Sequence, residues 1–217
     1  KALRDSENLM ILDLNQILRS EVCDKLETTF HAMFGGRALA FLNAAKNICV
    51  DALDRLDDCD ALYHNTEHSA RVTLVGLQVL LGKQTASHDV TPGEWLNVVA
   101  ALVCHDIGYV RGICNADRGP SLATGIANNT TYIATERSDA ALMPIHVDRG
   151  KAFVGQRLGS ENLVEEAFVQ SCIERTRFPV PADSWYALTD DYPGLVRGAD
   201  LIGQLSDPAY LTKLPAI

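Results

Sequence analysis

Apolar residues recur at the three- and four-residue spacing of amphipathic helices through most of this chain, and this periodicity constrains the fold more than any other feature. Val72, Val75 and Val79 follow the spacing, whereas the sustained period-two alternation of half-buried strands is hard to find. The sequence therefore predicts an all-α fold. We expect helices over residues 6–30, 37–57, 66–82, 92–107, 120–136, 143–158, 161–175, 183–189 and 193–205.

The chain reads as one domain. Its 217 residues include no internal repeat, low-complexity tract or linker rich in Pro, Gly or Ser. A chain of this length with 47% hydrophobic residues can bury one substantial core. We expect a single compact domain over residues 1–217, in which the helices of residues 1–60 pack on a core formed by residues 61–207.

Charge and composition exclude several classes of partner. The formal net charge of -9 at pH 7 would repel a nucleic acid duplex, which leaves a small phosphorylated molecule as a substrate class. No apolar run reaches the roughly 18 residues that cross a bilayer, and the first ten residues carry no signal-type apolar stretch. The six cysteines form no CxxC pair, which favours reduced thiols. We expect a cytoplasmic protein with no membrane partner.

Histidines and aspartates that suit a metal site occur in three separate segments. His64 and His68 are four residues apart, so they share one face if the segment is helical. His105 and Asp106 follow an apolar stretch that ends at a glycine, and Asp200 lies among small and apolar residues. Because an ionised carboxylate in apolar surroundings is costly unless it is paired or bound to metal, both aspartates need a partner.

The combination of these segments is more informative than any one of them. A single histidine on a helix is more often an ordinary core or surface residue than a ligand. Imidazole nitrogen and carboxylate oxygen together suit borderline and hard divalent ions. The joint pattern predicts a divalent metal site, and it does not distinguish among Mn, Fe, Mg, Zn, Co and Ni.

The order of these residues resembles a known ligand set. His105 and Asp106 after an apolar helix, with His68 upstream and Asp200 downstream, resemble the H, HD and D ligands of the HD superfamily of metal-dependent phosphohydrolases. Each piece is common by itself, but the ordered combination is specific. The resemblance implies a multi-helix HD-domain bundle that hydrolyses a phosphate ester.

A second motif narrows the resemblance within that superfamily. Tyr63, His64 and Asn65, followed by His68, resemble the YHNxxH signature of class I cyclic nucleotide phosphodiesterases. The two motifs together cover residues 63 to about 205. The phosphodiesterases therefore supply the closest expectation for the fold and for the roles of individual residues.

The resemblance assigns roles to these residues. The four residues that would bind the first metal are His68, His105, Asp106 and Asp200. Asp106 would also bridge to a second metal, so we expect two divalent ions, and His64 would be the general acid. Two ions about 3.5 to 4 Å apart can activate a bridging hydroxide and neutralise charge in the transition state, while an imidazolium protonates the departing alkoxide.

Further candidates flank the matched motifs. The segment from His146 to Gly150 resembles the HxxxG segment of the HD-GYP cyclic dinucleotide phosphodiesterases. It implies that His146, like His64, ligates or hydrogen-bonds near the second metal; an ordinary polar histidine at a helix start is the alternative. Five arginines are candidates for binding phosphate through charge-assisted hydrogen bonds, and we expect one or two of them to face the site. They are Arg111, Arg149, Arg175, Arg177 and Arg197.

The sequence also departs from the family patterns. Tyr109 stands where the cyclic nucleotide enzymes have a histidine that helps to arrange the metal waters, and Arg71 stands where they have an aspartate. The paired histidines of the HD-GYP proteins are missing around Cys172. The chain is therefore not expected to be a strict member of either phosphodiesterase family.

Three functions follow as hypotheses. The first is hydrolysis of a phosphate ester, preferably a phosphodiester in a nucleotide-like small molecule, with His64 and Asp106 as catalytic residues. The second is an HD-type di-iron oxygenase acting on a small polyol or phosphonate, with His64 and His146 as extra ligands. The third is a non-catalytic HD signalling module, which would be expected to have lost ligands, whereas all four are present.

Overall fold

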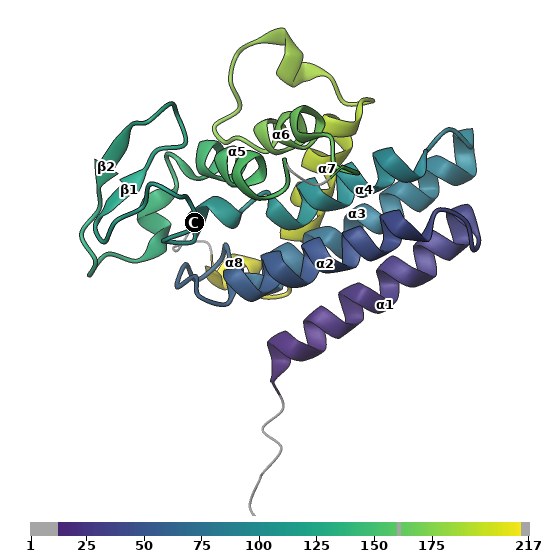
Figure 1. Cartoon of the computed structure of the whole chain (residues 1–217), viewed down its shortest axis with the longest axis horizontal. Helices are drawn as coiled ribbons and strands as arrows, with labels where there is room; N and C mark the ends of the chain where they lie inside the picture. Colours follow the sequence, from purple (N-terminus) through teal and green to yellow (C-terminus); the bar gives the residue numbers. More distant parts are fainter. Residues whose placement is uncertain (1–12, 160–161, 214–217) are drawn as a thin grey trace, which may run out of the picture.

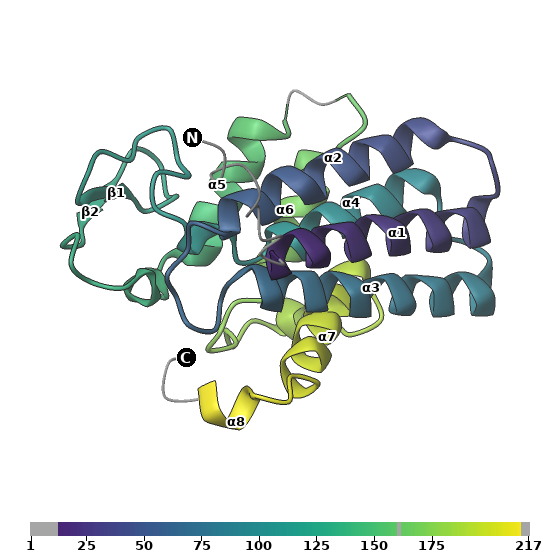
Figure 2. The same cartoon turned by 90° about the horizontal axis from the view of Figure 1, so that it is seen from below.

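A computed structural model of the chain describes residues 13–159 and 162–213. Four long helices form a bundle in the described molecule (Figure 1): α1 (Leu14–Phe34), α2 (Leu39–Leu56), α3 (Thr66–Ser87) and α4 (Pro92–Cys104). Within this bundle, α1 packs on α2 and α3, and α4 packs on α2 and α3. Figure 2 shows the four helices lying side by side.

The second half of the chain covers one side and one end of this bundle. It contributes α5 (His146–Arg157), α6 (Glu166–Arg175), α7 (Tyr192–Leu205) and the short α8 (Tyr210–Lys213). Of these, α6 packs on α4, α5 and α7, while α7 also packs on α3. Three 3-10 turns connect the elements, at Ile107–Tyr109, Asp139–Leu142 and Ser184–Ala187. The described residues are thus mostly helical, as expected, although they also include a two-stranded hairpin.

Helix α4 forms the centre of the core. It starts where the sequence predicts, because Thr91 and Glu94 form a reciprocal capping box and Pro92 occupies the first turn. Every residue from Trp95 to Cys104 is buried. The residues that follow this helix are therefore delivered to the interior of the protein.

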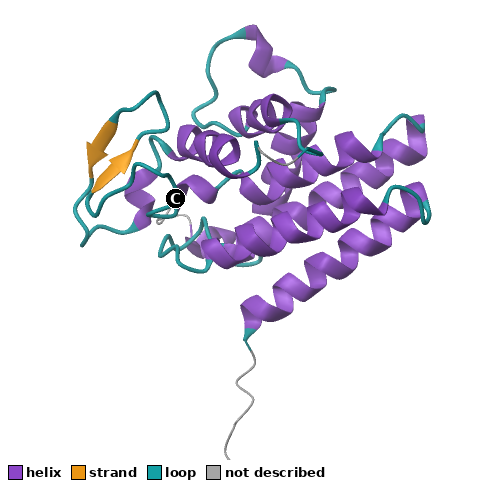
Figure 3. Ribbon diagram, in the orientation of Figure 1, coloured by secondary structure: helices purple, strands orange, loops and turns teal. Residues whose placement is uncertain are grey.

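The helix expected over residues 120–136 is wrong. This stretch forms an antiparallel hairpin of β1 (Ser121–Ala123) and β2 (Thr130–Tyr132), in which Leu122 pairs with Thr131. Gly125 and Ala127 between the strands adopt positive φ values of 81° and 49°, which a right-handed helix does not allow. In Figure 3 the hairpin stands at the edge of the molecule, apart from the long helices.

Several expected boundaries also need correction. The helix expected over 92–107 ends at Cys104, and a 3-10 turn follows. The helix expected from residue 143 begins at His146, two residues after Pro144. The segment 183–189 is a 3-10 turn at Ser184–Ala187, and helix α8 was not expected. Residues 6–12 and 161 of the expected helices lie outside the described residues.

No helix in the described part of the chain is long and apolar enough to cross a membrane.

Candidate metal centre

Four elements bring the ligand candidates together. His64 ends the loop that leads into α3, and His68 lies in the first turn of that helix, where the Asn65 side chain accepts a hydrogen bond from the His68 backbone N–H at 3.2 Å. His105 is the C-cap of α4, and Asp106 follows it. Asp200 comes from α7, which packs on α3 and α4.

The donor atoms of the four predicted ligands lie close to one another. His68 Nε2 is 3.3 Å from His105 Nε2, 3.4 Å from Asp106 Oδ2 and 3.3 Å from Asp200 Oδ1. His105 Nε2 is 3.2 Å from Asp106 Oδ2 and 3.6 Å from Asp200 Oδ1. Donors bound at about 2.0–2.1 Å in a tetrahedron are about 3.3–3.4 Å apart. These five separations therefore match the edges of a coordination tetrahedron around one ion.

Hydrogen bonds on the outer side of two imidazoles orient them for coordination. His105 Nδ1 lies 2.7 Å from the carbonyl oxygen of Leu102, and His146 Nδ1 lies 2.7 Å from that of Met143. A carbonyl oxygen only accepts, so each Nδ1 is the protonated nitrogen and donates. In the neutral rings, Nε2 then presents its lone pair inward, as metal-binding histidines do.

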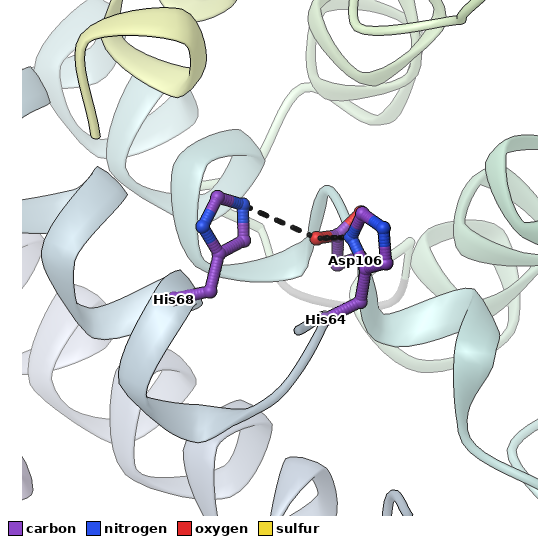
Figure 4. A group of neighbouring side chains, drawn as sticks. All are labelled: His64, His68 and Asp106. Carbon is purple, nitrogen blue, oxygen red and sulfur yellow. Dashed lines mark hydrogen bonds and ion pairs between the residues drawn. The ribbon is translucent and has the colours of Figure 1, made fainter. Parts of the chain in front are cut away.

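Asp106 connects this cluster to two further imidazoles. His64 Nδ1 lies 2.9 Å from Asp106 Oδ2, and His146 Nε2 lies 3.8 Å from Asp106 Oδ1. Figure 4 shows the rings of His64 and His68 directed toward the Asp106 carboxylate from the same stretch of chain. His64, His68 and Asp106 form one group able to hold a metal ion, and His68, His105 and Asp200 form a second, overlapping group.

The electrostatics of this buried cluster favour a cation. Burial raises the pKa of Asp106, but His105 and His64 outweigh burial and hold that pKa well below its usual range. Burial lowers the pKa of His105, but Asp106 and Asp200 overcome it and raise the pKa to about 9. Burial also lowers the pKa of His146, which favours a neutral ring. The buried Asp106 and the half-buried Asp200 thus draw positive charge into the space between the ligand atoms.

A comparison with models of protein families identifies the family of this chain. A family model described as Npun_R2479-like matches residues 12–217. The chain belongs to the Npun_R2479-like family. No curated protein and no solved structure matches it. The cluster of this Npun_R2479-like protein therefore has to be interpreted from its own chemistry.

Tyr109 is a site residue that the sequence analysis treated only as a departure from a motif. Its ring centroid is 4.4 Å from that of His64 and 4.4 Å from that of His146, with interplanar angles of 11° and 18°. Its side chain is buried, and burial raises the pKa of its phenol. The signal in the sequence was its place three residues after Asp106, but its two ring contacts depend on the tertiary fold.

The phosphate-binding role expected for Arg149 and Arg175 does not fit the structure. Arg149 is fully buried and donates to the Asp117 carboxylate and to three backbone carbonyl oxygens. Arg175 is also fully buried, bonded to the Leu188 carbonyl and to Asp191. Neither guanidinium reaches a surface where it would meet a substrate.

The other three arginines differ in how many bonds their guanidinium groups make within the protein. Arg111 donates to Asp139 and to three backbone carbonyl oxygens. These bonds occupy its guanidinium group and stabilise the loop around Asp139. Arg177 lines a cavity of about 320 Å³ that His146 also lines, although Asp148 and Glu174 already bind it. Arg197 donates one hydrogen bond, to the Tyr186 carbonyl oxygen, and precedes Asp200 by three residues on α7, so the two share a helix face. Arg177 and Arg197 remain the candidates for a phosphate.

Proposed function

We propose that this chain is a metal-dependent phosphohydrolase of the HD type. The observation that carries the proposal is the convergence of His68, His105, Asp106 and Asp200, whose ligand atoms are spaced like those around one divalent ion. Their chemistry also fits, because two imidazoles and two carboxylates suit Zn, Fe, Mn and Co in particular. The resemblance of the same residues to the HD ligand set supplies the reaction class.

The protein's own residues suggest how a phosphate ester would be cleaved. The four ligands would hold the ion, and Asp106 together with His146 would hold a second one. Bound divalent ions lower the pKa of water and neutralise the charge of a phosphate. Arg197, which shares a helix face with Asp200, would donate to a phosphate oxygen of the substrate.

His64 would deliver the proton to the leaving group. Its Nδ1–H donates to Asp106, so the carboxylate fixes the orientation of the ring. As a general acid, it would carry the transferable proton on Nε2 and give it to the departing oxygen of a phosphodiester. Positioned proton transfer of this kind contributes about 10²–10⁴ in rate.

The test uses the full chain with added Mn²⁺ and two substrates, bis-para-nitrophenyl phosphate and para-nitrophenyl phosphate. We expect hydrolysis of the diester, and loss of both metal content and turnover in Asp106→Ala. Asp24→Ala, which changes an exposed aspartate on α1, is the matched control and should retain both. Activity retained in Asp106→Ala would eliminate the proposed centre.

A second variant separates metal binding from proton transfer. His64→Gln should retain the first metal, because His68, His105, Asp106 and Asp200 are unchanged. Its kcat for the diester should fall about 100-fold or more. A His64→Gln protein with unchanged kcat would remove the general-acid role and leave the metal centre standing.

One observation favours a second function, oxidation of a small polyol or phosphonate by two irons. His64 and His146 both approach Asp106, so together with His68 and His105 four imidazoles lie around this one carboxylate. Extra imidazole ligands suit iron as well as zinc. Two irons per chain as purified, with oxygen consumed in step with loss of substrate, would favour this function; divalent metal without oxygen uptake would exclude it.

A further inference from the structure

Tyr109 contacts the rings of His64 and His146, the two histidines near Asp106 that are not among the four predicted ligands. Its ring is nearly parallel to both, at 4.4 Å from each centroid. The two histidine centroids are themselves 6.2 Å apart. One aromatic side chain therefore contacts both His64, the proposed proton donor, and His146.

The backbone of Tyr109 is held in a fixed position. It ends the 3-10 turn at Ile107–Tyr109, which packs against α5. Its N–H donates to the carbonyl oxygen of Asp106 at 3.1 Å, and Gly108 before it lies in close contact with His146. The backbone that carries the ring is thus fixed by its contacts with Asp106 and His146.

The ring itself is supported by a hydrophobic cluster separate from the main core. Tyr109, Leu122 and Leu142 form this second cluster, and Cys59, Ile133 and Ile145 pack around it. Leu122 lies in β1 and Leu142 ends a 3-10 turn, so the segment between Asp106 and His146 folds back onto the ring. The β1–β2 hairpin, which the sequence did not predict, thereby packs against Tyr109 through Leu122.

We propose that Tyr109 is a positioning residue, which holds His64 and His146 in register with the Asp106 carboxylate and is itself held by the second cluster. The inference rests on the proposed function for its kinetic consequence. It assigns to the ring, and not to the hydroxyl, the task of keeping the proton donor aligned. The residue does not need to touch substrate or metal.

The kinetic test compares three variants of the full chain in diester hydrolysis. Tyr109→Leu removes the flat ring and should lower kcat about tenfold to a hundredfold, since misplacing a catalytic group by about 1 Å has effects of this size. KM should change less than about twofold. Tyr109→Phe keeps the ring and should restore kcat to within about threefold of the natural chain. Phe153→Leu, a matched loss of an aromatic ring from the main core, should leave kcat unchanged.

Two further measurements do not depend on turnover. The ion bound by the four ligands should be retained in Tyr109→Leu, because these ligands are untouched. The proton on His64 Nδ1, bonded to Asp106, should give a downfield NMR signal in the natural chain and in Tyr109→Phe. That signal should be lost in Tyr109→Leu.

The outcomes discriminate between roles. Equal loss of kcat in the Phe and Leu variants would assign the function to the hydroxyl and overturn the proposal, as would full activity in Tyr109→Leu. If Tyr109→Leu does not fold, Leu122→Ala replaces it, and this variant should weaken the His64 signal without touching either imidazole. Absence of hydrolysis by the natural chain would refute the proposed function, while the NMR comparison would still decide the role of Tyr109.

Discussion

Gly108 approaches His146 so closely that a Cβ atom on the glycine would stand 1.9 Å from the His146 carbonyl oxygen. The same atom would also stand 2.8 Å from the backbone N of Gly150. These neighbours belong to the backbone of α5 and cannot rotate away. The contact fixes the distance between the turn that follows Asp106 and the helix that begins with His146.

Gly108→Ala should therefore push α5 away from the 3-10 turn. We expect a loss of about 3 kcal/mol or more in the free energy of unfolding, in the upper range for overpacking, and a lower kcat in the folded fraction. Gly82→Ala is the control, because nothing lies within 4 Å of its Cβ position in α3. It should stabilise the protein by about 0.5–1 kcal/mol. Urea unfolding of both variants checks the prediction, which fails if both shift in the same direction.

The inward-facing nitrogen of His105 leads to a second prediction. His105→Ala should lower the affinity for Mn²⁺ or Zn²⁺ by more than about 100-fold, because it removes a buried donor from the centre of the ligand set. His31→Ala, on the exposed end of α1, should bind metal like the natural chain. Isothermal titration with each ion measures the difference. Equal affinities in the two variants would show that the ion binds elsewhere.

The sequence predicts the strongly patterned helices well. Helix α4 begins at the expected proline because its capping box and its apolar run are local signals. The four predicted ligands also lie together, as their resemblance to the HD ligand set implies. Their role as ligands remains a prediction for the experiments above.

Features that depend on distant partners were not predictable in the same way. The strands of the hairpin are three residues long, too short for an alternating pattern to be recognised. Arg149 looks like any arginine near a motif, yet its partners come from 26 to 41 residues earlier in the chain. The ring contacts of Tyr109 likewise join residues far apart in sequence. Tertiary packing decides all three.

The pKa of Glu174 predicts a pH-dependent contribution to stability. Burial raises this pKa, but hydrogen bonds from Arg177, Lys151 and Tyr186 outweigh burial and lower it to about 2. A depressed carboxyl pKa stabilises the folded state above the unfolded pKa of about 4.3 and loses that effect as the pH falls toward 2. The shift corresponds to about 3 kcal/mol, which solvent screening of this half-buried group reduces, so Glu174→Gln should cost about 2 kcal/mol at pH 7. The difference from the natural chain should shrink between about pH 5 and pH 2.

Chemical denaturation at several pH values between 2 and 7 measures this effect. Exposed Glu136→Gln is the control and should change stability by less than about 0.5 kcal/mol at every pH. A difference for Glu174→Gln that stays constant over the whole range would show that its carboxyl group is not preferentially ionised in the folded protein.

Arg149 and Asp117 form a buried ion pair whose removal should reveal how the hairpin is attached to α5. Nη1 and Nη2 of Arg149 each lie 3.0 Å from a different Asp117 oxygen. Arg149→Leu leaves this carboxylate uncompensated and should cost about 3–5 kcal/mol. Adding Asp117→Asn removes the uncompensated charge, so the double variant should be more stable than the sum of the two single losses predicts.

Arg157→Ala, on the exposed face of the same helix, is the control and should change stability by less than about 0.5 kcal/mol. Strict additivity in this cycle, measured by urea unfolding, would mean that the two side chains do not stabilise each other.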